Sequence, residues 1–266
     1  MAWSERQLAM LREMGVRMFV PVRPSAPAPA PAGPPTAALA PAVPASAEAS
    51  AATPASAPSA AGSLDWAQLR AAVAACRACR LCESRKQTVF GVGHPHAHWM
   101  VIGEAPGAQE DEQGEPFVGA AGQLLDAMLR ALDLSRAAQG EPARRVFIAN
   151  TLKCRPPGNR NPQPDELAAC EPFLRRQIEL VQPRIILAMG RFAVQSLLRT
   201  NEAIGRLRGR VHRYQGVPLV VTYHPAYLLR NLVDKARAWD DLCLAAQVVE
   251  QHGKGDEPGA PARPRS

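Results

Sequence analysis

The chain has 266 residues, of which 47% are hydrophobic, and its 31 Lys and Arg residues exceed its 24 Asp and Glu residues to give a net charge of +7. This length supports one sizeable domain with extensions, and the core of such a domain needs no disulfide bonds for stability. The positive charge favours a polyanionic partner such as nucleic acid, but many basic proteins bind no DNA.

The N-terminal stretch contains charged residues throughout, among them Glu5, Arg12 and Arg17, so it lacks the unbroken apolar run of a signal peptide. No later stretch is apolar for long enough to span a bilayer. We therefore expect an intracellular, cytoplasmic protein that is not secreted, has no membrane partner and associates with the nucleoid through DNA. In a reducing compartment, clustered cysteines more often bind a metal or take part in catalysis than form disulfides.

Composition divides the chain into four segments. Residues 23–62 are almost entirely Ala, Pro and Ser, a composition that buries little and breaks helices, so we expect a disordered linker. Residues 1–22 before it are a short peptide, and the folded domain is predicted to span residues 63–252. Residues 253–266 are predicted to be a disordered tail.

The N-terminal peptide has two interpretations. Leu8, Leu11 and Met18 could form one apolar face of a short helix. Such a helix could dock on a replication or repair protein, whereas the simpler interpretation is a loosely ordered tail. Apart from such a partner, we expect the protein to be a monomer.

Cys76, Cys79 and Cys82 follow one another at intervals of three residues in the stretch "CRACRLCESR". The thiols could be ligands of a metal cluster, parts of disulfides, a redox pair with a spare thiol, or small apolar core residues. A C-x2-C-x2-C run is one of the patterns that bind iron–sulfur clusters. The spacing alone does not choose among these interpretations.

The rest of the domain alternates short β-type runs with longer helical patterns. Four runs are predicted to be strands: residues 98–103, 145–151, 184–190 and 217–224. Three stretches with helical spacing of apolar residues follow the first three strands: residues 122–134, 164–181 and 191–198. This alternation predicts an α/β protein, a three-layer α/β/α sandwich with a mostly parallel central sheet of about four strands. Ligands of such sheets bind beyond the carboxyl ends of the strands.

Three of the loops at these strand ends contain polar groups suited to chemistry. The loop of residues 103–119, "GEAPGAQEDEQGEPFVG", includes Glu104 and Glu110, which could act as a general acid or base or belong to a solvated acidic loop. Asn150 ends the second apolar strand, where it could pair with an amide-like edge or form a turn. His224 ends the fourth, where it could donate a hydrogen bond to a developing anion, although a lone His is more often structural.

Taken together, the stretches "GEAPGAQEDEQGEPFVGAAGQLLD", "NTLKCRPPGNRNPQPDELAAC" and "HPAYLLR" closely resemble the iron–sulfur-containing family 4 uracil-DNA glycosylases. The resemblance covers residues 76–239 and excludes the N-terminal peptide and the linker. It implies a DNA repair enzyme that flips uracil out of single- or double-stranded DNA and hydrolyses its N-glycosidic bond, leaving an abasic site and free uracil.

The resemblance also implies a cofactor. In that family a [4Fe-4S] cluster is held by four cysteines, which match Cys76, Cys79, Cys154 and Cys170. Cys82 falls on a position that is not a ligand in the family, and Cys243 is predicted to be a core residue of a C-terminal helix. Zinc is a chemically reasonable alternative for four thiolates.

The resemblance assigns roles to the loop residues as well. The residues that it implies line the uracil pocket are Gly103, Glu104 and Ala105. Phe117 would stack on the base, and Asn150 would accept from N3–H and donate to O4, a pattern that cytosine does not match. His224 would hydrogen-bond O2, where negative charge accumulates as the bond breaks.

Better-known members of the superfamily orient the attacking water with an aspartate at the position of Ala105. Family 4 members lack this aspartate, so another group must place the water. The candidates are Glu104 and Glu110, with Glu104 preferred for its place in the loop.

The stretch after His224 resembles the loop that family members insert into the space left by the flipped base. Its candidate wedge residues are Leu228 and Leu229, either of which could instead be a core residue, and Arg230 suits a phosphate. Further arginines could add phosphate contacts: Arg155, Arg160, Arg206, Arg208 and Arg210.

Two other functions are compatible with parts of the sequence. A binding protein could capture uracil-containing DNA without turnover. A related group in the superfamily bonds covalently to abasic DNA through a histidine in a basic insert within the second loop. The corresponding stretch here, "CRPPGNRNPQPDELAAC", has no histidine, which favours turnover. An electron-transfer module would use the cluster but would not explain Asn150 and His224 at strand ends.

Overall fold

The computed structural model describes residues 58–255. The N-terminal peptide, most of the predicted linker and most of the tail lie outside the described residues, so docking through the peptide stays a prediction. Both predicted domain boundaries differ from the structure: residues 58–62 belong to the 3-10 helix η1 (Pro58–Ser63), and helix α10 (Asp234–Gly255) extends past residue 252. Within this part of the chain, no helix combines the length and apolar character that crossing a membrane requires.

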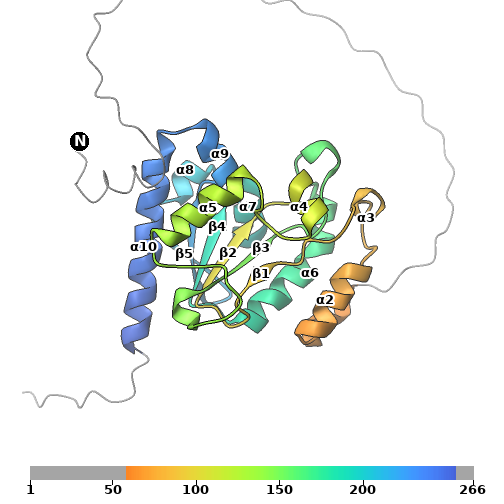
Figure 1. The fold of residues 1–266 in the computed structure, drawn as a ribbon, viewed down its shortest axis with the longest axis horizontal. Coiled ribbons are helices and arrows are strands. Elements are labelled where there is room, and N and C mark those ends of the chain that lie inside the picture. The colour runs from red at the N-terminus through yellow and green to blue at the C-terminus, as the bar shows by residue number, and fades with distance from the viewer. Residues whose placement is uncertain (1–57, 256–266) are drawn as a thin grey trace, which may run out of the picture.

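A six-stranded sheet with strand order β1-β3-β2-β4-β6-β5 forms the centre of the domain (Figure 1). The inner strands are mutually parallel and match the four predicted strands: β3 (Val146–Asn150), β2 (Trp99–Gly103), β4 (Ile185–Met189) and β6 (Val217–Thr222). The edge strands are antiparallel to their neighbours: β1 (Val92–Gly93) and β5 (Val211–Tyr214). The prediction of about four strands was therefore two strands short, because neither edge strand has a continuous apolar run.

The helices in chain order are α2 (Trp66–Ala75), α3 (Leu81–Ser84), α4 (Ala108–Gln113), α5 (Ala120–Arg130), α6 (Pro164–Val181), α7 (Arg191–Leu198), α8 (Ile204–Leu207), α9 (Pro225–Arg230) and α10. The short 3-10 helices after η1 are η2 (Pro142–Arg144) and η3 (Pro157–Asn159). The structure confirms the predicted bounds of α6 and α7. Helix α5 ends earlier than predicted, since the chain turns at Asp133, whose φ is 59°.

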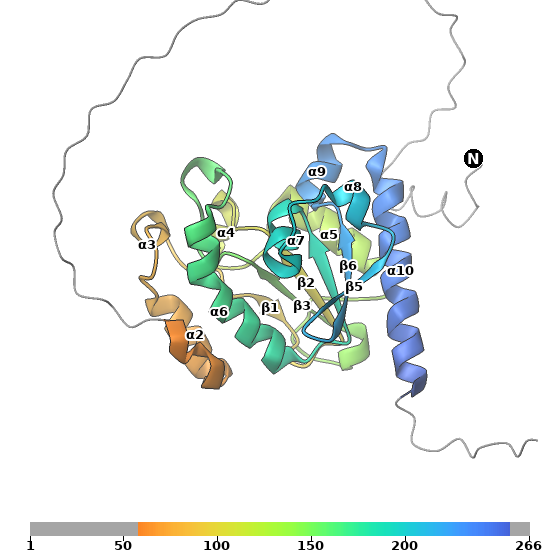
Figure 2. The same ribbon diagram turned by 180° about the vertical axis from the view of Figure 1, so that it is seen from behind.

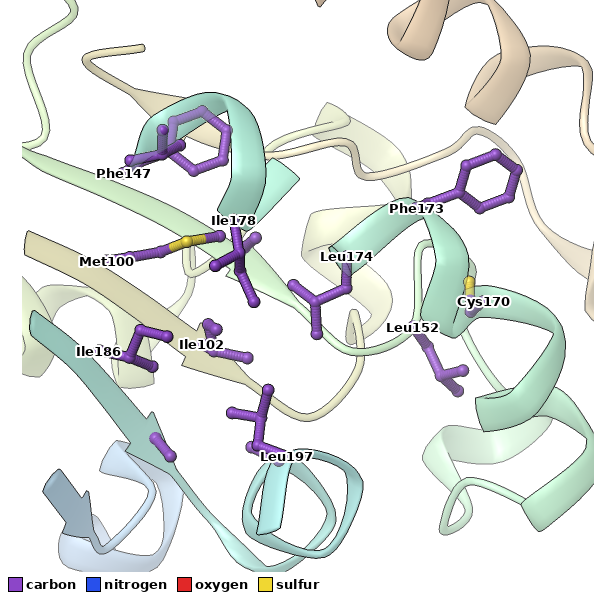
Figure 3. Close-up of a cluster of buried hydrophobic side chains, with 14 of the residues drawn as sticks. Met100, Ile102, Phe147, Leu152, Cys170, Phe173, Leu174, Ile178, Ile186 and Leu197 are labelled. Atoms are coloured by element: carbon purple, nitrogen blue, oxygen red, sulfur yellow. The ribbon is translucent and has the colours of Figure 1, made fainter. Parts of the chain in front are cut away.

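Alternate strand residues point to opposite faces of the sheet, so the protein has two apolar layers. On one face, Met100, Ile102 and Ile186 pack against Leu174 and Ile178 of α6 (Figure 3). The opposite face packs against α5 and α10, and Figures 1 and 2 show α10 on the other side of the sheet from α2 and α6. The structure confirms the predicted three-layer α/β/α sandwich.

Parallel pairing brings the carboxyl ends of β2, β3, β4 and β6 to one edge of the sheet. Backbone hydrogen bonds continue the β2–β3 ladder into the loops, because the N–H groups of Thr151 and Leu152 donate to the carbonyls of Gly103 and Glu104 at 3.0 and 3.1 Å. The loops that contain the predicted site residues therefore start from one rigid edge.

Candidate active site and cysteine cavity

The loops at this edge enclose a cleft of about 860 Å³. Six of the residues predicted from sequence to form the site line it: Glu104, Ala105, Glu110, Phe117, Asn150 and His224. Side chains that are up to 120 residues apart in sequence therefore meet in one place. Concave sites of this size with a few convergent polar groups are typical of small-molecule binding sites.

Asn150 forms one wall of the cleft. Only 2% of the residue is exposed, and its side-chain amide makes no hydrogen bond to any other described residue. A Cβ atom on Gly103 would lie 2.5 Å from Asn150 Oδ1 and 2.6 Å from Phe117 Cζ, so only glycine lets the amide and the ring approach this strand end. The amide lines the cleft, where its acceptor and two donors are available to a ligand.

Phe117 is held in an uncommon backbone conformation, with a φ of 56°. Glu110 joins the start of α4 to the residues directly after Phe117, since its Oε2 accepts from Gly107 N at 3.0 Å while its Oε1 accepts from Val118 N at 3.1 Å and Gly119 N at 3.4 Å. Positive φ is rare for a bulky residue and persists only where the surroundings impose it, as they often do at functional sites.

His224 lies at the N-terminus of α9 with its ring stacked on that of Phe117, at 5.3 Å between centroids. Its Nδ1 accepts a hydrogen bond from Ala226 N at 3.1 Å, so the neutral ring carries its proton on Nε2. Burial lowers the pKa of His224 to about 4, Glu110 opposes this shift, and Arg230 adds to it. The cleft therefore holds a neutral imidazole whose Nε2–H is free to donate.

Glu104 faces the start of α7. Its Oε1 accepts from Phe192 N at 3.0 Å, and a Cβ atom on Gly190 would lie 2.6 Å from that oxygen. Burial raises the pKa of Glu104, while hydrogen bonds from the backbone of Phe192 and Arg191 oppose the increase. The carboxylate thus uses the positive end of α7 and still lines the cleft.

A second, smaller cavity collects most of the cysteines. The cysteines around it are Cys76, Cys79, Cys82, Cys154 and Cys170. Burial raises the pKa of Cys154 and raises that of Cys170 to about 12. The nearby thiol of Cys76 adds to both increases. Cys82 adds to the increase in the pKa of Cys79.

Hydrogen-bond donors surround these sulfur atoms. Arg85 Nη1 donates to Cys154 Sγ at 3.0 Å, and Lys153 N donates to Cys170 Sγ at 3.3 Å. Lys153 is fully buried, which lowers its pKa to about 8, and its Nζ donates to Asn150 O and Gln177 Oε1, each at 2.7 Å. One lysine therefore connects the cysteine cavity with the strand end that presents Asn150.

Residues 90–243 match the model of the uracil DNA glycosylase superfamily. The chain is 41% identical over 191 residues to the type-4 uracil-DNA glycosylase of Pyrobaculum aerophilum, covering 68% of this chain and 93% of that protein. Type-4 uracil-DNA glycosylases of Saccharolobus solfataricus and Sulfurisphaera tokodaii are 44% and 40% identical, over 59% and 62% of this chain and 73% and 76% of theirs. This chain belongs to the type-4 uracil-DNA glycosylases.

For this family member, the structure separates the two leucines predicted as a DNA wedge. Leu228 is 1% exposed and packs in the core with α5 and α10, so it is not available to DNA in this conformation. Leu229 is 42% exposed and precedes Arg230, which lines the cleft. Two further apolar residues of the same segment, Leu232 and Val233, are 54% and 86% exposed and were missed. Their loop position gives no periodicity that would have marked them.

The predicted phosphate-binding arginines also differ among themselves. Arg160 and Arg208 are engaged with the buried carboxylates Glu166 and Asp241, at 2.5 and 3.0 Å. Arg191, which sequence reasoning missed, lines the cleft and makes no ion pair with another described residue. Its position directly after β4 was the available signal, because that strand end belongs to the ligand-binding edge.

Replacing Gly122 with Ala should lower both activity and stability, although a Gly-to-Ala change inside a helix normally stabilises. A Cβ atom there would lie 1.8 Å from the carbonyl oxygen of Phe117, so α5 or the loop that contains Phe117 must move. We expect the free energy of unfolding to fall by about 1–3 kcal/mol, the usual effect of overpacking. Thermal denaturation checks this, with Gly205→Ala as the control because no atom lies closer than 4.0 Å to its added methyl. A Gly122→Ala variant as stable as the parent would contradict the close approach of α5 to the carbonyl oxygen of Phe117.

Proposed function

We propose that this chain removes uracil from DNA by hydrolysing the N-glycosidic bond. The observation that carries the proposal is the free amide of buried Asn150, which shares one cleft with the Phe117 ring and the neutral, donating His224. The type-4 relatives support it. The enzyme cannot reach the bond within a duplex, so the nucleotide must flip into the cleft, at a cost of about a few kcal/mol.

Recognition of the base follows from the donors and acceptors in the cleft. The Asn150 carbonyl can accept from uracil N3–H while its NH₂ group donates to O4, and the Phe117 ring offers a flat apolar face. Cytosine presents an acceptor at N3 and a donor at its amino group, which reverses the pattern. Gly103 completes the pocket by keeping the space in front of both side chains open.

His224 supplies the differential stabilisation that catalysis requires. As the glycosidic bond breaks, negative charge accumulates on uracil O2, and Nε2–H of His224 donates to that atom more strongly than it would to the neutral base. A neutral histidine suffices, because the ring only has to donate a hydrogen bond. Glu104 is our candidate for orienting the attacking water, since both oxygens of Glu110 are occupied by the loop around Phe117.

The cysteine cavity is the proposed site of a [4Fe-4S] cluster held by Cys76, Cys79, Cys154 and Cys170. N–H donors directed at the sulfur atoms of Cys154 and Cys170 suit iron-bound thiolates, because they stabilise negative charge on sulfur. A zinc ion needs sulfur atoms about 2.3 Å from one point. No group of three or more His, Cys, Asp or Glu side chains within residues 58–255 is arranged as a metal site, so the choice of the cluster over zinc rests on the resemblance to the type-4 family. When bound, the cluster would join the segment before β1 to the loop after β3.

For the DNA wedge we propose Leu229 together with the exposed pair Leu232 and Val233. These are the apolar side chains that the structure exposes beside Arg230 and the cleft. An apolar side chain inserted at the vacated position would hold the flipped state open, and Arg230 and Arg191 would contact phosphates on either side.

The excision rate should not fall between about pH 7 and pH 5 through titration of His224, because its pKa is lowered to about 4. An ordinary histidine would protonate near its usual pKa of 6.5. The unfolded chain binds that proton while the folded chain does not, so the contribution of His224 to stability is lost as the pH falls from about 6.5 towards about 4. Single-turnover rates measured over this range provide the test. The expectation would be contradicted if the rate fell with a midpoint near pH 6.5 and this midpoint were absent in His224→Ala.

The function itself is tested by incubating the full chain with an oligonucleotide that contains one uracil and then cleaving abasic sites with alkali. We expect strand cleavage at the uracil and release of free base in more than stoichiometric amounts. Tight binding without cleavage would instead identify a non-turnover binding protein. Cleavage of neither single- nor double-stranded substrate, without binding, would exclude both functions.

A further inference from the structure

We propose that Asp111 and the segment Arg85–Gln87 couple the cysteine cavity to the base-binding pocket, so that Asp111 is a positioning residue for Phe117. The inference rests on the proposed function, because it describes how the cysteine cavity of that enzyme helps to position its base-binding pocket. It assigns a role to a buried carboxylate that neither recognition of the base nor the cysteine ligands use.

The first link joins the cavity to Arg85. Besides donating to Cys154 Sγ, the guanidinium donates through Nη2 to the carbonyls of Ala74 and Cys76, both at 3.0 Å. One side chain thus holds the segment of Cys76 and the loop of Cys154 at their present separation. Its planar fork of donors makes this geometry specific.

The second link joins the next two residues to helix α4. Asp111 is only 2% exposed, and its two oxygens accept from Lys86 N at 3.0 and 3.1 Å, with Gln87 N at 3.5 Å from Oδ1. The side chains of Lys86 and Gln87 add contacts to Glu112, the former an ion pair of 2.5 Å. These backbone donors lie one and two residues after Arg85, so one short segment binds the cysteine cavity through a side chain and α4 through its backbone.

The third link runs within α4 itself. Glu110, adjacent to Asp111, accepts from the N–H groups of Val118 and Gly119 directly after Phe117, whereas Asp111 faces the Arg85–Gln87 segment. Successive helix residues project about 100° apart, which lets one short helix bind both segments. At the end of α4, a Cβ atom on Gly114 would lie 2.7 Å from Gln87 Oε1, so the segment and the helix are in close contact.

The connected path therefore runs from Cys154 through Arg85 and Asp111 to Glu110 and Phe117. A buried carboxylate that accepts several backbone N–H groups is costly to remove, because those donors then lack a partner. Coupling along this path would appear as non-additive effects of changes at its two ends.

The experiment is a double-mutant cycle in the full chain between Arg85→Met and Asp111→Ala, which leaves every cysteine in place. The measured quantity is the preference for a duplex with a non-cleavable 2′-fluoro-2′-deoxyuridine over the same duplex with thymidine. Iron content is determined for every variant. Arg80→Met and Glu115→Ala are matched controls, because both residues are exposed and neither belongs to the path.

We expect each single variant to reduce the uracil preference about tenfold, within the range typical of coupled sites. The uracil preference of the double variant should be no lower than that of the single variant with the larger loss. Asp111→Ala should keep the iron content of the parent. If Asp111→Ala does not fold, Asp111→Asn preserves the shape and carries the same expectation.

Reductions that multiply in the double variant would overturn the coupling, and so would a parental preference in Asp111→Ala. Loss of iron in Arg85→Met with an unchanged uracil preference would also overturn it, since the cavity would then not influence the pocket. A parent chain with no uracil preference would refute the proposed function and with it this inference. If the inference alone fails, the parent still prefers uracil, so the two failures are distinguishable.

Discussion

Replacing His224 with Ala should lower the single-turnover rate of uracil excision by about a hundred- to a thousandfold, the typical effect of losing one preorganised donor to a developing anion. Asn150→Ala should have an effect of similar size, because its amide is buried, free and directed at the cleft. Both interactions strengthen as charge develops on the base, so affinity for uracil-containing DNA should change much less than the rate.

Rates at saturating enzyme and equilibrium binding to a non-cleavable substrate together check this expectation. His96→Ala is the matched control, because His96 is exposed in the loop before β2 and does not line the cleft. It should retain the parental rate. Losses of only a few-fold at both His224 and Asn150 would mean that the chemistry takes place elsewhere.

Cys170→Ser should lose iron, brown colour and thermal stability together, and Cys154→Ser should behave in the same way. We expect the parent chain to contain about four iron atoms per molecule. The two sulfur atoms lie in the buried part of the cavity beneath α6, so loss of the cluster would also detach the loop after β3 from that helix. Iron analysis, the visible spectrum and the melting temperature are the measurements.

Cys82→Ser is the informative comparison, because Cys82 lines the same cavity but is not in the predicted ligand set. It should keep colour and stability, as should Cys243→Ser, whose side chain packs partly buried against the core on α10. Colour that survived in Cys154→Ser or disappeared in Cys82→Ser would show that the ligand set has been assigned incorrectly.

The four inner strands and the limits of α6 and α7 were predictable from the sequence. Long apolar runs and helical periodicity are local signals, and the cores on the two sheet faces reinforce them. The chain order of the three motif loops also predicted a common site, because parallel strands place all their carboxyl ends on one edge. The two edge strands were missed, since β1 has two residues and the residues of β5 are only partly buried.

Which side chains are free to act depends instead on the packed structure. Leu228 and Leu229 are adjacent identical residues, yet one is buried in the core and the other faces solvent. The proton position and lowered pKa of His224 depend on Ala226 and on burial, and the roles of Arg85 and Asp111 depend on partners far away in sequence. Burial, hydrogen bonding and pKa are properties of the packed environment, and contacts between distant residues are not encoded in any local pattern.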